Sequence, residues 1–425
     1  MKEKLNIKKL FSTSVAKLTM GSFIGQLITI LVSPITTRIY NAEELGIYTL
    51  LLTIVNMIGP VVCAKYEMAI VTENEERKVY ALIVLCTIIN LILSTISIIG
   101  YTIYLICTNI FSPIYIIYLI IIFIILLLNG LSNVLIYYNN RNKDYDIISR
   151  VYVIRILVQN VLLIVLGLLK CSVMGLIIAQ LLGMLVGIRK QSERLIPHLK
   201  ELRCIRKEEI IEVAKSNKKL MLYTAPSNLV NLASYSILNF FITGLYGATT
   251  FGYYSMSYRM LGLPLTLISR NIAQIFFEKA TTENRKVGGF TKTLWQTTLG
   301  LSIVSIIMVA GLELLAPWAF SIFFGESWRI SGEYVQILAW MFGIRLVVAA
   351  LTPALVIVKR QDIELKIQCM FIITSIVIYI LCNTLSLPIE QFLTLITICY
   401  SIIYIILYMM IYIQSKNNKK RKEVN

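Results

Sequence analysis

The sequence predicts an all-α polytopic membrane protein of about twelve transmembrane helices. Of its 425 residues 57% are hydrophobic, and the mean hydropathy is +0.76. The apolar residues come in blocks of roughly 20, the length that crosses a hydrocarbon layer of about 30 Å. Charged residues are scarce inside these blocks and crowd between them. Blocks this long do not alternate in the way that membrane β-barrel strands do, so helices are the expected element.

Each predicted span is one apolar block bounded by polar residues. The blocks lie near residues 15–37, 46–70, 79–106, 114–138, 147–168, 172–190, 220–244, 250–275, 293–314, 334–357, 364–385 and 390–413. With the N-terminus inside and residues near the span ends counted with the adjoining side, 34 of the 40 Lys and Arg residues fall on the inside, three on the outside and three deep within spans. This asymmetry follows the positive-inside rule. We therefore expect both termini to lie in the cytoplasm and the protein to lie in the inner membrane.

The longest segment between spans, residues 189–219, divides the chain into two sets of six spans. We expect an N-terminal six-helix bundle over 1–190, a cytoplasmic basic linker over 191–218 and a C-terminal six-helix bundle over 219–425. Apolar residues recur along the linker at helical spacing: Leu195, Leu199, Leu202, Ile205 and Ile210. This spacing predicts an amphipathic helix on the membrane surface, and a solvated charged linker is the alternative.

Two similar motifs, 206 residues apart, indicate an internal repeat. The first contains Tyr40, Ala42, Gly46 and Tyr48, and the second contains Tyr246, Ala248, Gly252 and Tyr254. Each joins the first and second spans of its half. Because six is an even number, the halves have the same orientation, which predicts a parallel repeat with a site at the interface between halves. Chance similarity between apolar segments is the alternative.

Three arginines lie deep inside predicted spans: Arg155, Arg259 and Arg345. A charge at the membrane centre costs roughly 2.5–3.5 kcal/mol on insertion scales, so an arginine kept there indicates a function. The functional interpretation is a water-filled cationic cavity that attracts an anion, since the forked guanidinium suits phosphate. The structural alternative is that each arginine donates to helix carbonyls or extends to the membrane surface.

A polar stripe follows one face of the seventh span, formed by Asn228, Asn231, Tyr235 and Asn239. Their spacings of three and four residues keep them on one helix face. In the fifth span, Gln159 lies one turn from Arg155 on the same face. These residues are predicted either to line a cavity and bind sugar hydroxyls or to join helices by hydrogen bonds.

Several other classes of function are disfavoured. The net charge of +17 is scattered one loop at a time, which argues against nucleic-acid binding. His198 is the only histidine, and the eight cysteines form no C-x-x-C pair, so we expect neither a metal site nor a cofactor. No phosphate-binding glycine loop, carboxylate pair or nucleophile–base set is present, so we do not expect an enzyme.

The chain resembles the bacterial polysaccharide-repeat flippases of O-antigen and capsule synthesis. The similarity rests on short motifs in both halves: Ser33-Pro34 through Thr37-Arg38, Tyr40 to Tyr48, Tyr66 to Ile70, Tyr223 to Asn228, Phe251 to Tyr254 and Gln274 to Phe277. The resemblance implies the multidrug/oligosaccharidyl-lipid/polysaccharide exporter fold, with two six-helix bundles around a central cavity. It also implies transport by alternating access. The substrate it implies is a polyprenyl-pyrophosphate-linked oligosaccharide.

The sequence thus favours a flippase that moves lipid-linked repeat units from the cytoplasmic to the outer leaflet. Its expected partners are this substrate, membrane lipid, a coupling H⁺ or Na⁺ ion and the polysaccharide polymerase machinery. A multidrug cation antiporter of the same fold is the alternative, which the excess of intramembrane arginine over acid disfavours. A membrane glycan polymerase is a further alternative, which the short outside loops disfavour.

Overall fold

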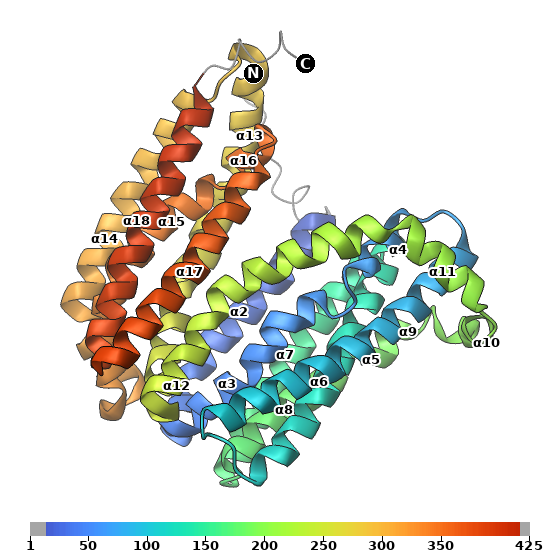
Figure 1. The fold of residues 1–425 in the computed structure, drawn as a ribbon, viewed down its shortest axis with the longest axis horizontal. Coiled ribbons are helices and arrows are strands. Elements are labelled where there is room, and N and C mark those ends of the chain that lie inside the picture. The colour runs from blue at the N-terminus through green and yellow to red at the C-terminus, as the bar shows by residue number, and fades with distance from the viewer. Residues whose placement is uncertain (1–13, 417–425) are drawn as a thin grey trace. The chain divides into compact units, whose positions relative to one another are not determined.

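The structure is a computed structural model that describes residues 14–416, and its regular elements are all helices within that range (Figure 1). The basic residues near the two ends that support the predicted orientation, among them Lys2 and Lys419, lie outside the described residues. Contacts divide the chain into a first unit, Met1–Leu232, and a second unit, Ala233–Asn425. The two units are described separately.

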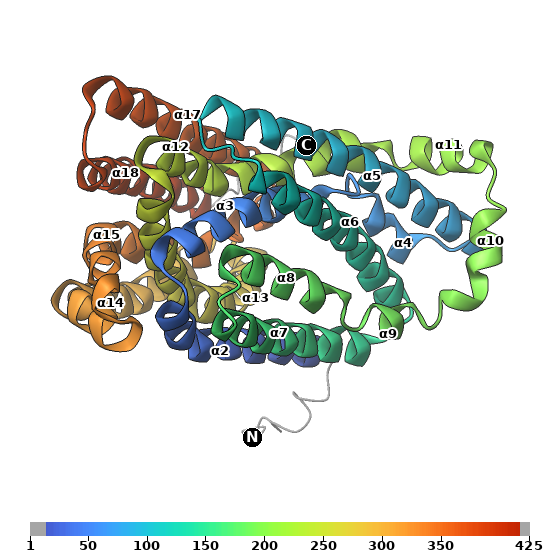
Figure 2. The same cartoon turned by 90° about the horizontal axis from the view of Figure 1, so that it is seen from below.

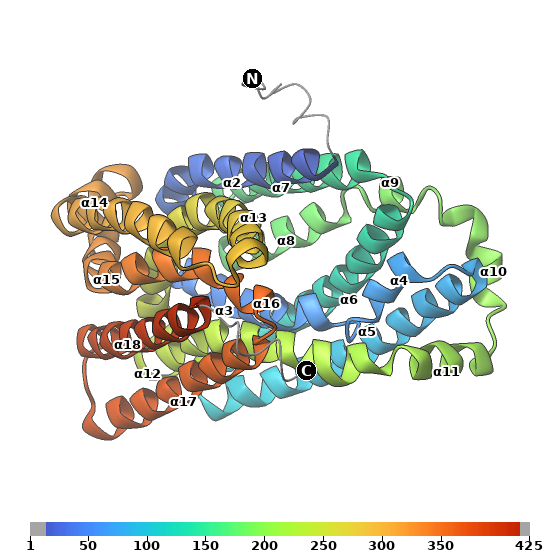
Figure 3. The same cartoon turned by 90° about the horizontal axis from the view of Figure 1, so that it is seen from above.

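Six long helices form the body of the first unit, and shorter helices follow them. The long helices are α2 (Ser14–Ile39), α3 (Ala42–Ile58), α5 (Glu76–Cys107), α6 (Ile114–Arg141), α7 (Tyr145–Leu168) and α8 (Ser172–Leu185). The turns η1 (Gly59–Val61) and η2 (Tyr66–Met68) and the short α4 (Ala69–Thr72) connect α3 to α5. After α8 come α9 (Ile188–Ser192), η3 (Ile196–His198), α10 (Leu199–Arg203), α11 (Lys207–Ser216) and η4 (Leu220–Thr224). Figures 2 and 3 show α2 and α7 side by side.

The second unit begins inside α12 and is built around α15. Its elements are α12 (Ala225–Pro264), η5 (Leu265–Ser269), α13 (Arg270–Val287), α14 (Thr291–Phe324), η6 (Glu326–Trp328), α15 (Arg329–Leu351), α16 (Ala354–Ile357), α17 (Gln361–Leu385) and α18 (Ile389–Ser415). Helix α15 contacts α13, α14 and α18. It is therefore the central helix of this unit.

The predicted number of spans follows once a break in α12 is recognised. Eleven helical segments of the described chain are long and apolar enough to cross a membrane, and one of them runs over 68 residues, 220–287. A straight helix of that length would extend about 100 Å, more than three times the hydrocarbon thickness. Gly247 interrupts it with φ 80° and ψ 175°, a conformation that favours glycine. Division at Gly247 gives twelve spans.

Matching features in the two units fit the predicted repeat. The first break between spans comes at Asn41, which caps α3 with its side chain, and the break at Gly247 is 206 residues later. Just before each break a tyrosine hydroxyl donates to a carbonyl in or just after the fifth span of its unit: Tyr40 to Leu163 at 2.9 Å and Tyr246 to Leu387 at 3.0 Å. The third and fourth, fourth and sixth, and fifth and sixth spans contact each other in both units.

Large apolar side chains are exposed along the long helices. Leu31, Leu168, Ile306 and Leu314 are each more than two-thirds exposed. A soluble protein rarely exposes apolar surface on this scale, whereas lipid covers it without cost. The exposed side chains therefore support the multi-pass membrane assignment.

The linker is helical, but its apolar residues pack on the first unit. Leu195 is buried, and Leu202, Ile205 and Ile210 contact the same core cluster, while Leu199 is 49% exposed. The predicted position of this stripe was the membrane surface. In the structure, most of its residues instead pack against protein. Short helices separated by turns replace the single helix, because Pro197 falls in η3 and residues 204–206 separate α10 from α11.

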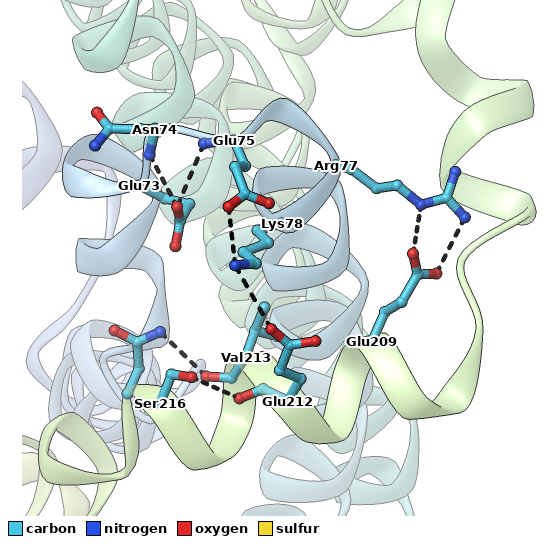
Figure 4. A network of polar contacts seen from close by, with 10 residues as sticks. Glu73, Asn74, Glu75, Arg77, Lys78, Glu209, Glu212, Val213 and Ser216 are labelled. Carbon is cyan, nitrogen blue, oxygen red and sulfur yellow. Dashed lines mark hydrogen bonds and ion pairs between the residues drawn. The ribbon is translucent and has the colours of Figure 1, made fainter.

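Ion pairs attach α11 to the start of α5 (Figure 4). Arg77 donates to both carboxylate oxygens of Glu209, and the Nζ atom of Lys78 lies 3.5 Å from the Oε1 atom of Glu212. The hydrogen bond from Arg77 lowers the pKa of Glu209 below its usual range. Tyr66 adds a hydrogen bond to the carbonyl of Ala214 at 3.2 Å.

Candidate functional site

Arg345 lies in the middle of α15, the central helix of the second unit. From Val335 to Leu351 it is the only charged residue. Its neighbours on the helix, including Met341, Phe342 and Leu346, are buried. A lone cation in such a helix must find its partners on neighbouring helices or in a ligand.

Aromatic residues supply those partners. The Arg345 guanidinium donates a hydrogen bond to the Tyr258 hydroxyl at 2.8 Å. Its central carbon also lies 4.7 Å from the centre of the Tyr235 ring and 5.4 Å from that of Phe342. These distances permit cation–π attraction, which is stronger where water is excluded. We call Arg345 with Tyr235, Tyr258 and Phe342 the arginine–tyrosine cluster.

Helix positions explain how the cluster assembles. Tyr235 and Tyr258 come from α12, before and after the break at Gly247, while Phe342 precedes Arg345 by one turn of α15. Tyr258 packs edge-on against Phe342 and contacts, at a tilt, the ring of Tyr254 one turn earlier on α12. Two separated parts of α12 therefore meet at one residue of α15.

Most N–H donors of Arg345 have no hydrogen-bond partner among the described residues. Within the described residues its guanidinium makes one hydrogen bond, to Tyr258, and no carboxylate lies within ion-pair distance. A guanidinium carries five N–H donors in a planar fork. The remaining donors suit an anion that offers two oxygens, such as a phosphate, and the tyrosine hydroxyls can bond to hydroxyl groups nearby.

Arg155 has different surroundings. In the first unit it donates to the Val186 carbonyl at 2.8 Å, to the Ser132 hydroxyl at 3.2 Å and to the Gln191 side-chain oxygen at 3.0 Å. Gln191 is only 2% exposed, and its own carbonyl accepts from the buried Asn139 at 2.7 Å. Protein groups thus occupy three of the five N–H donors of Arg155, as the structural alternative expects.

The local fold creates this arrangement at the end of α8. The helix stops at Leu185, Val186 is extended with ψ 131°, and Gly187 has φ 78°. The carbonyl of Val186 then lies beyond the helix and lacks a helical N–H partner, which is the usual state of carbonyls at a C-terminus. Arg155 supplies the missing donor, and its positive charge suits that end of the helix dipole.

The other predicted site residues are distributed over both units. Gln159 donates to the Gln180 side chain, which also accepts from Tyr48 at 3.3 Å, so it joins helices in the first unit. Arg259 is exposed on α12 and is not among the contacts of Arg345. The side chains of Arg259 and Tyr258 diverge by about 100° around the helix.

The polar stripe of the seventh span is divided between the units. Asn228 and Asn231 belong to the first unit, and Asn228 donates to the carbonyl of Thr224 in its own chain segment at 2.9 Å. Tyr235 and Asn239 belong to the second. Tyr235 alone of the four contacts Arg345 in that unit.

Sequence analysis missed Tyr258, Phe342, Ser132 and Gln191. The first two surround Arg345, and the last two hold Arg155. None has an unusual sequence context among so many apolar and aromatic residues. The one usable signal was the spacing of Tyr254 and Tyr258, four residues apart and therefore on one helix face.

Comparisons with known structures identify the fold. An inward-facing multidrug resistance MATE family transporter of the MOP superfamily aligns over 96% of this chain and 99% of its own, with a TM-score of 0.70 and 15% identity. An outward-facing structure of such a transporter aligns over 100% of both chains, with a TM-score of 0.63 and 13% identity. A MOP superfamily transporter from Pyrococcus furiosus Vc1 (DSM3638), whose binding pocket has reverse polarity that suggests a different function, aligns over 97% and 98%, with a TM-score of 0.56 and 14% identity. The fold is that of MOP superfamily transporters.

A family model identifies the chain more closely. The model for polysaccharide biosynthesis proteins matches residues 35–333, about two-thirds of the sequence. The chain therefore belongs to this family of polysaccharide biosynthesis proteins, as the resemblance predicted. No curated protein sequence matches it.

Proposed function

We propose that this protein is a flippase for polyprenyl-pyrophosphate-linked oligosaccharides in surface polysaccharide synthesis. It moves each unit from the cytoplasmic to the outer leaflet by alternating access, and the pyrophosphate binds Arg345. The family assignment and the transporter fold support export of a polysaccharide precursor. The sugar hydroxyls and the pyrophosphate are costly to bury in lipid, so unassisted crossing is very slow.

The arginine–tyrosine cluster is the observation that carries this proposal. Arg345 is a cation with one hydrogen bond and no acidic partner among the described residues, and a pyrophosphate supplies what it lacks. The Tyr258 hydroxyl lies beside it and can accept from and donate to the first sugar, and the Tyr235 ring packs against the guanidinium. Asn239, Arg259 and the first-unit residues Asn228, Asn231, Arg155 and Gln159 remain weaker substrate-binding proposals.

The proposal extends to location and partners. The protein lies in the bacterial inner membrane with both termini in the cytoplasm, and H⁺ or Na⁺ supplies the driving force. Outside, the delivered repeat unit passes to the polymerase machinery. The excess of basic residues on the predicted inner side supports the orientation.

A multidrug cation antiporter is the second candidate, because multidrug transporters share the fold. Such a protein needs an acidic group at its binding site, whereas Arg345 would repel a cationic drug. Drug accumulation in cells expressing the protein separates the two candidates. Reduced accumulation of a cationic dye with no effect on surface glycan would support the antiporter.

Substitution of Arg345 tests the flippase directly. In a strain that lacks its own flippase, Arg345→Met should leave the protein level unchanged and reduce surface glycan about 100-fold or more, since two charge-assisted hydrogen bonds are lost. Arg345→Lys should retain part of the activity, and Arg345→Glu should retain none. Arg329→Met is the matched control, because Arg329 lies on the same helix but is exposed and paired with Glu326 and Glu333. Full export by Arg345→Met at a normal protein level would refute the anion site.

Substitution of Tyr258 distinguishes a substrate-binding role of Arg345 from a structural one. If the only task of Arg345 is its hydrogen bond to Tyr258, Tyr258→Phe and Arg345→Met should impair export equally, and the double variant should be no worse. If Arg345 binds pyrophosphate, Tyr258→Phe should retain most of the export that Arg345→Met loses. Quantified surface glycan, normalised to protein level by immunoblot, provides the measurement.

A further inference from the structure

Two thiols and a carboxylate meet in the core of the first unit, apart from the arginine–tyrosine cluster. Cys63 lies in the turn between η1 and η2, Glu67 lies in η2, and Cys86 lies in α5. Both sulfur atoms and a carboxylate oxygen lie within 4.8 Å of one another. Cys63 and Cys86 are 0% exposed, and Glu67 is 1% exposed. These three residues are called the Cys–Glu–Cys cluster.

The backbone brings the cluster together from distant positions. Ala64 and Lys65 have φ angles of 50° and 63°, so the chain reverses sharply after Cys63 and returns with Glu67 on the same side. Cys86 reaches the same point from α5, which packs on η2. Because two elements supply the ligands, the spacing matches no metal motif, which explains why the sequence did not predict the site.

Glu67 lacks the partners that a buried carboxylate requires. Its Oε2 atom is buried without a hydrogen-bond partner in the described structure, and its Oε1 atom lies 3.9 Å from the Nζ atom of Lys65. The Cys63 sulfur makes a long contact, 3.7 Å, with the carbonyl of Gly130 and a hydrogen bond with the Cys86 thiol. An unsatisfied carboxylate in a protein core is costly, so each such group needs an explanation.

We propose that the Cys–Glu–Cys cluster binds one zinc ion. Sulfur ligands favour Zn²⁺ over Mg²⁺ or Ca²⁺, which prefer oxygen. Zn–S bonds of about 2.3 Å in a tetrahedral site place two sulfurs about 3.8 Å apart, which the spacing of the cluster allows. Two thiolates and a carboxylate carry three negative charges, which Zn²⁺ and Lys65 together balance. Binding releases the two thiol protons to solvent, and a further oxygen donor completes the tetrahedron.

The site has a structural consequence for the linker. The ion would tie α5 to the η1–η2 segment, and Tyr66 in that segment donates to Ala214 of α11. Zinc would therefore stabilise the surface on which the linker packs.

Metal analysis of the purified full-length protein tests the proposal. Protein prepared with reductant should contain about one zinc per chain after gel filtration. Cys63→Ser, Cys86→Ser and Glu67→Gln should each lose most of it. Cys382→Ser is the matched control, because Cys382 is also buried, lies in the second unit and should leave the zinc content unchanged.

A second measurement, on the wild-type protein, tests the proposal even if the variants fail to fold. Wild-type protein exchanged into Co²⁺ should show the charge-transfer and visible bands of thiolate-bound tetrahedral cobalt, and Zn²⁺ should remove them. Folded, reduced wild-type protein with no bound zinc and no such bands would overturn the proposal. A Cys63–Cys86 disulfide found by mass spectrometry in place of metal would also overturn it.

Discussion

Replacement of Arg155 by Met should destabilise the first unit by about 3 kcal/mol. The variant loses three hydrogen bonds from a charged donor, each contributing roughly 1.5–3 kcal/mol, or about 4.5–9 kcal/mol as an upper sum. Removing a charge from the membrane interior returns roughly 2.5–3.5 kcal/mol. The balance remains unfavourable because Ser132 and Gln191 are only 5% and 2% exposed, so water cannot replace the lost donor.

The assay measures thermal unfolding of the full-length protein in detergent. Size-exclusion chromatography of a fluorescent fusion quantifies the protein that remains folded at each temperature. For a unit of this size, 1 kcal/mol corresponds to about 2–4 °C, so the Tm should fall by roughly 6–12 °C. Arg150→Met is the control, since Arg150 is exposed on the same helix. Gln191→Leu should reduce the effect of Arg155→Met in the double variant, because the two residues share one network. An unchanged Tm together with lost export would refute this reasoning and assign Arg155 to the substrate.

Two further predictions concern orientation and the linker. In a background that keeps only the buried Cys63 and Cys86, cysteines introduced at Gly325 and Leu387 should react with an impermeant thiol reagent in intact cells, and one at Glu283 should not. The reverse pattern would invert the proposed topology. At pH 7, trypsin should cut the linker of Glu209→Gln somewhat faster than that of Glu208→Gln, an exposed neighbour, because only Glu209 pairs with Arg77. Because the pKa of Glu209 is lowered on folding, its contribution is present above its unfolded pKa of about 4.3 and is lost as the pH falls through the folded pKa. Equal cleavage of both variants would show that this pair does not hold α11.

The architecture could be predicted because the bilayer sets the length and hydrophobicity of each span, and both can be read from the sequence. Apolar block length predicted the spans, the family model confirms the polysaccharide biosynthesis family, and the structural comparison confirms the transporter fold. The break at Gly247 was also predictable, since a second motif at an offset of 206 residues marked the loop there. The position of the linker was not, because an apolar stripe has the same spacing whether lipid or protein covers it.

The environment of each arginine could not be read from the sequence. Arg155 and Arg345 carry the same signal, one cation in an apolar block, yet Arg155 donates to three protein groups and Arg345 to one. The difference depends on Val186 and Gln191, which reach Arg155 only through the turn after α8. The sequence of the helix that carries an arginine contains no pattern that reveals which side chains of other helices will contact it.

The contrast between the two arginines bears on how a flippase could release its cargo. A cation with one hydrogen-bonding partner, such as Arg345, can bind pyrophosphate tightly, but tight binding alone moves nothing, because only differential affinity between two states produces transport. Tyr258 offers a means of adjustment, since its hydroxyl competes with the anion for the Arg345 donors. Tyr235 and Tyr258 lie on opposite sides of the Gly247 break, so a change of angle there would alter both contacts of Arg345 together. Under the proposed function, a coupling ion or removal of the product would then need to bias only this one conformational equilibrium, while the polyprenyl tail stays in lipid throughout.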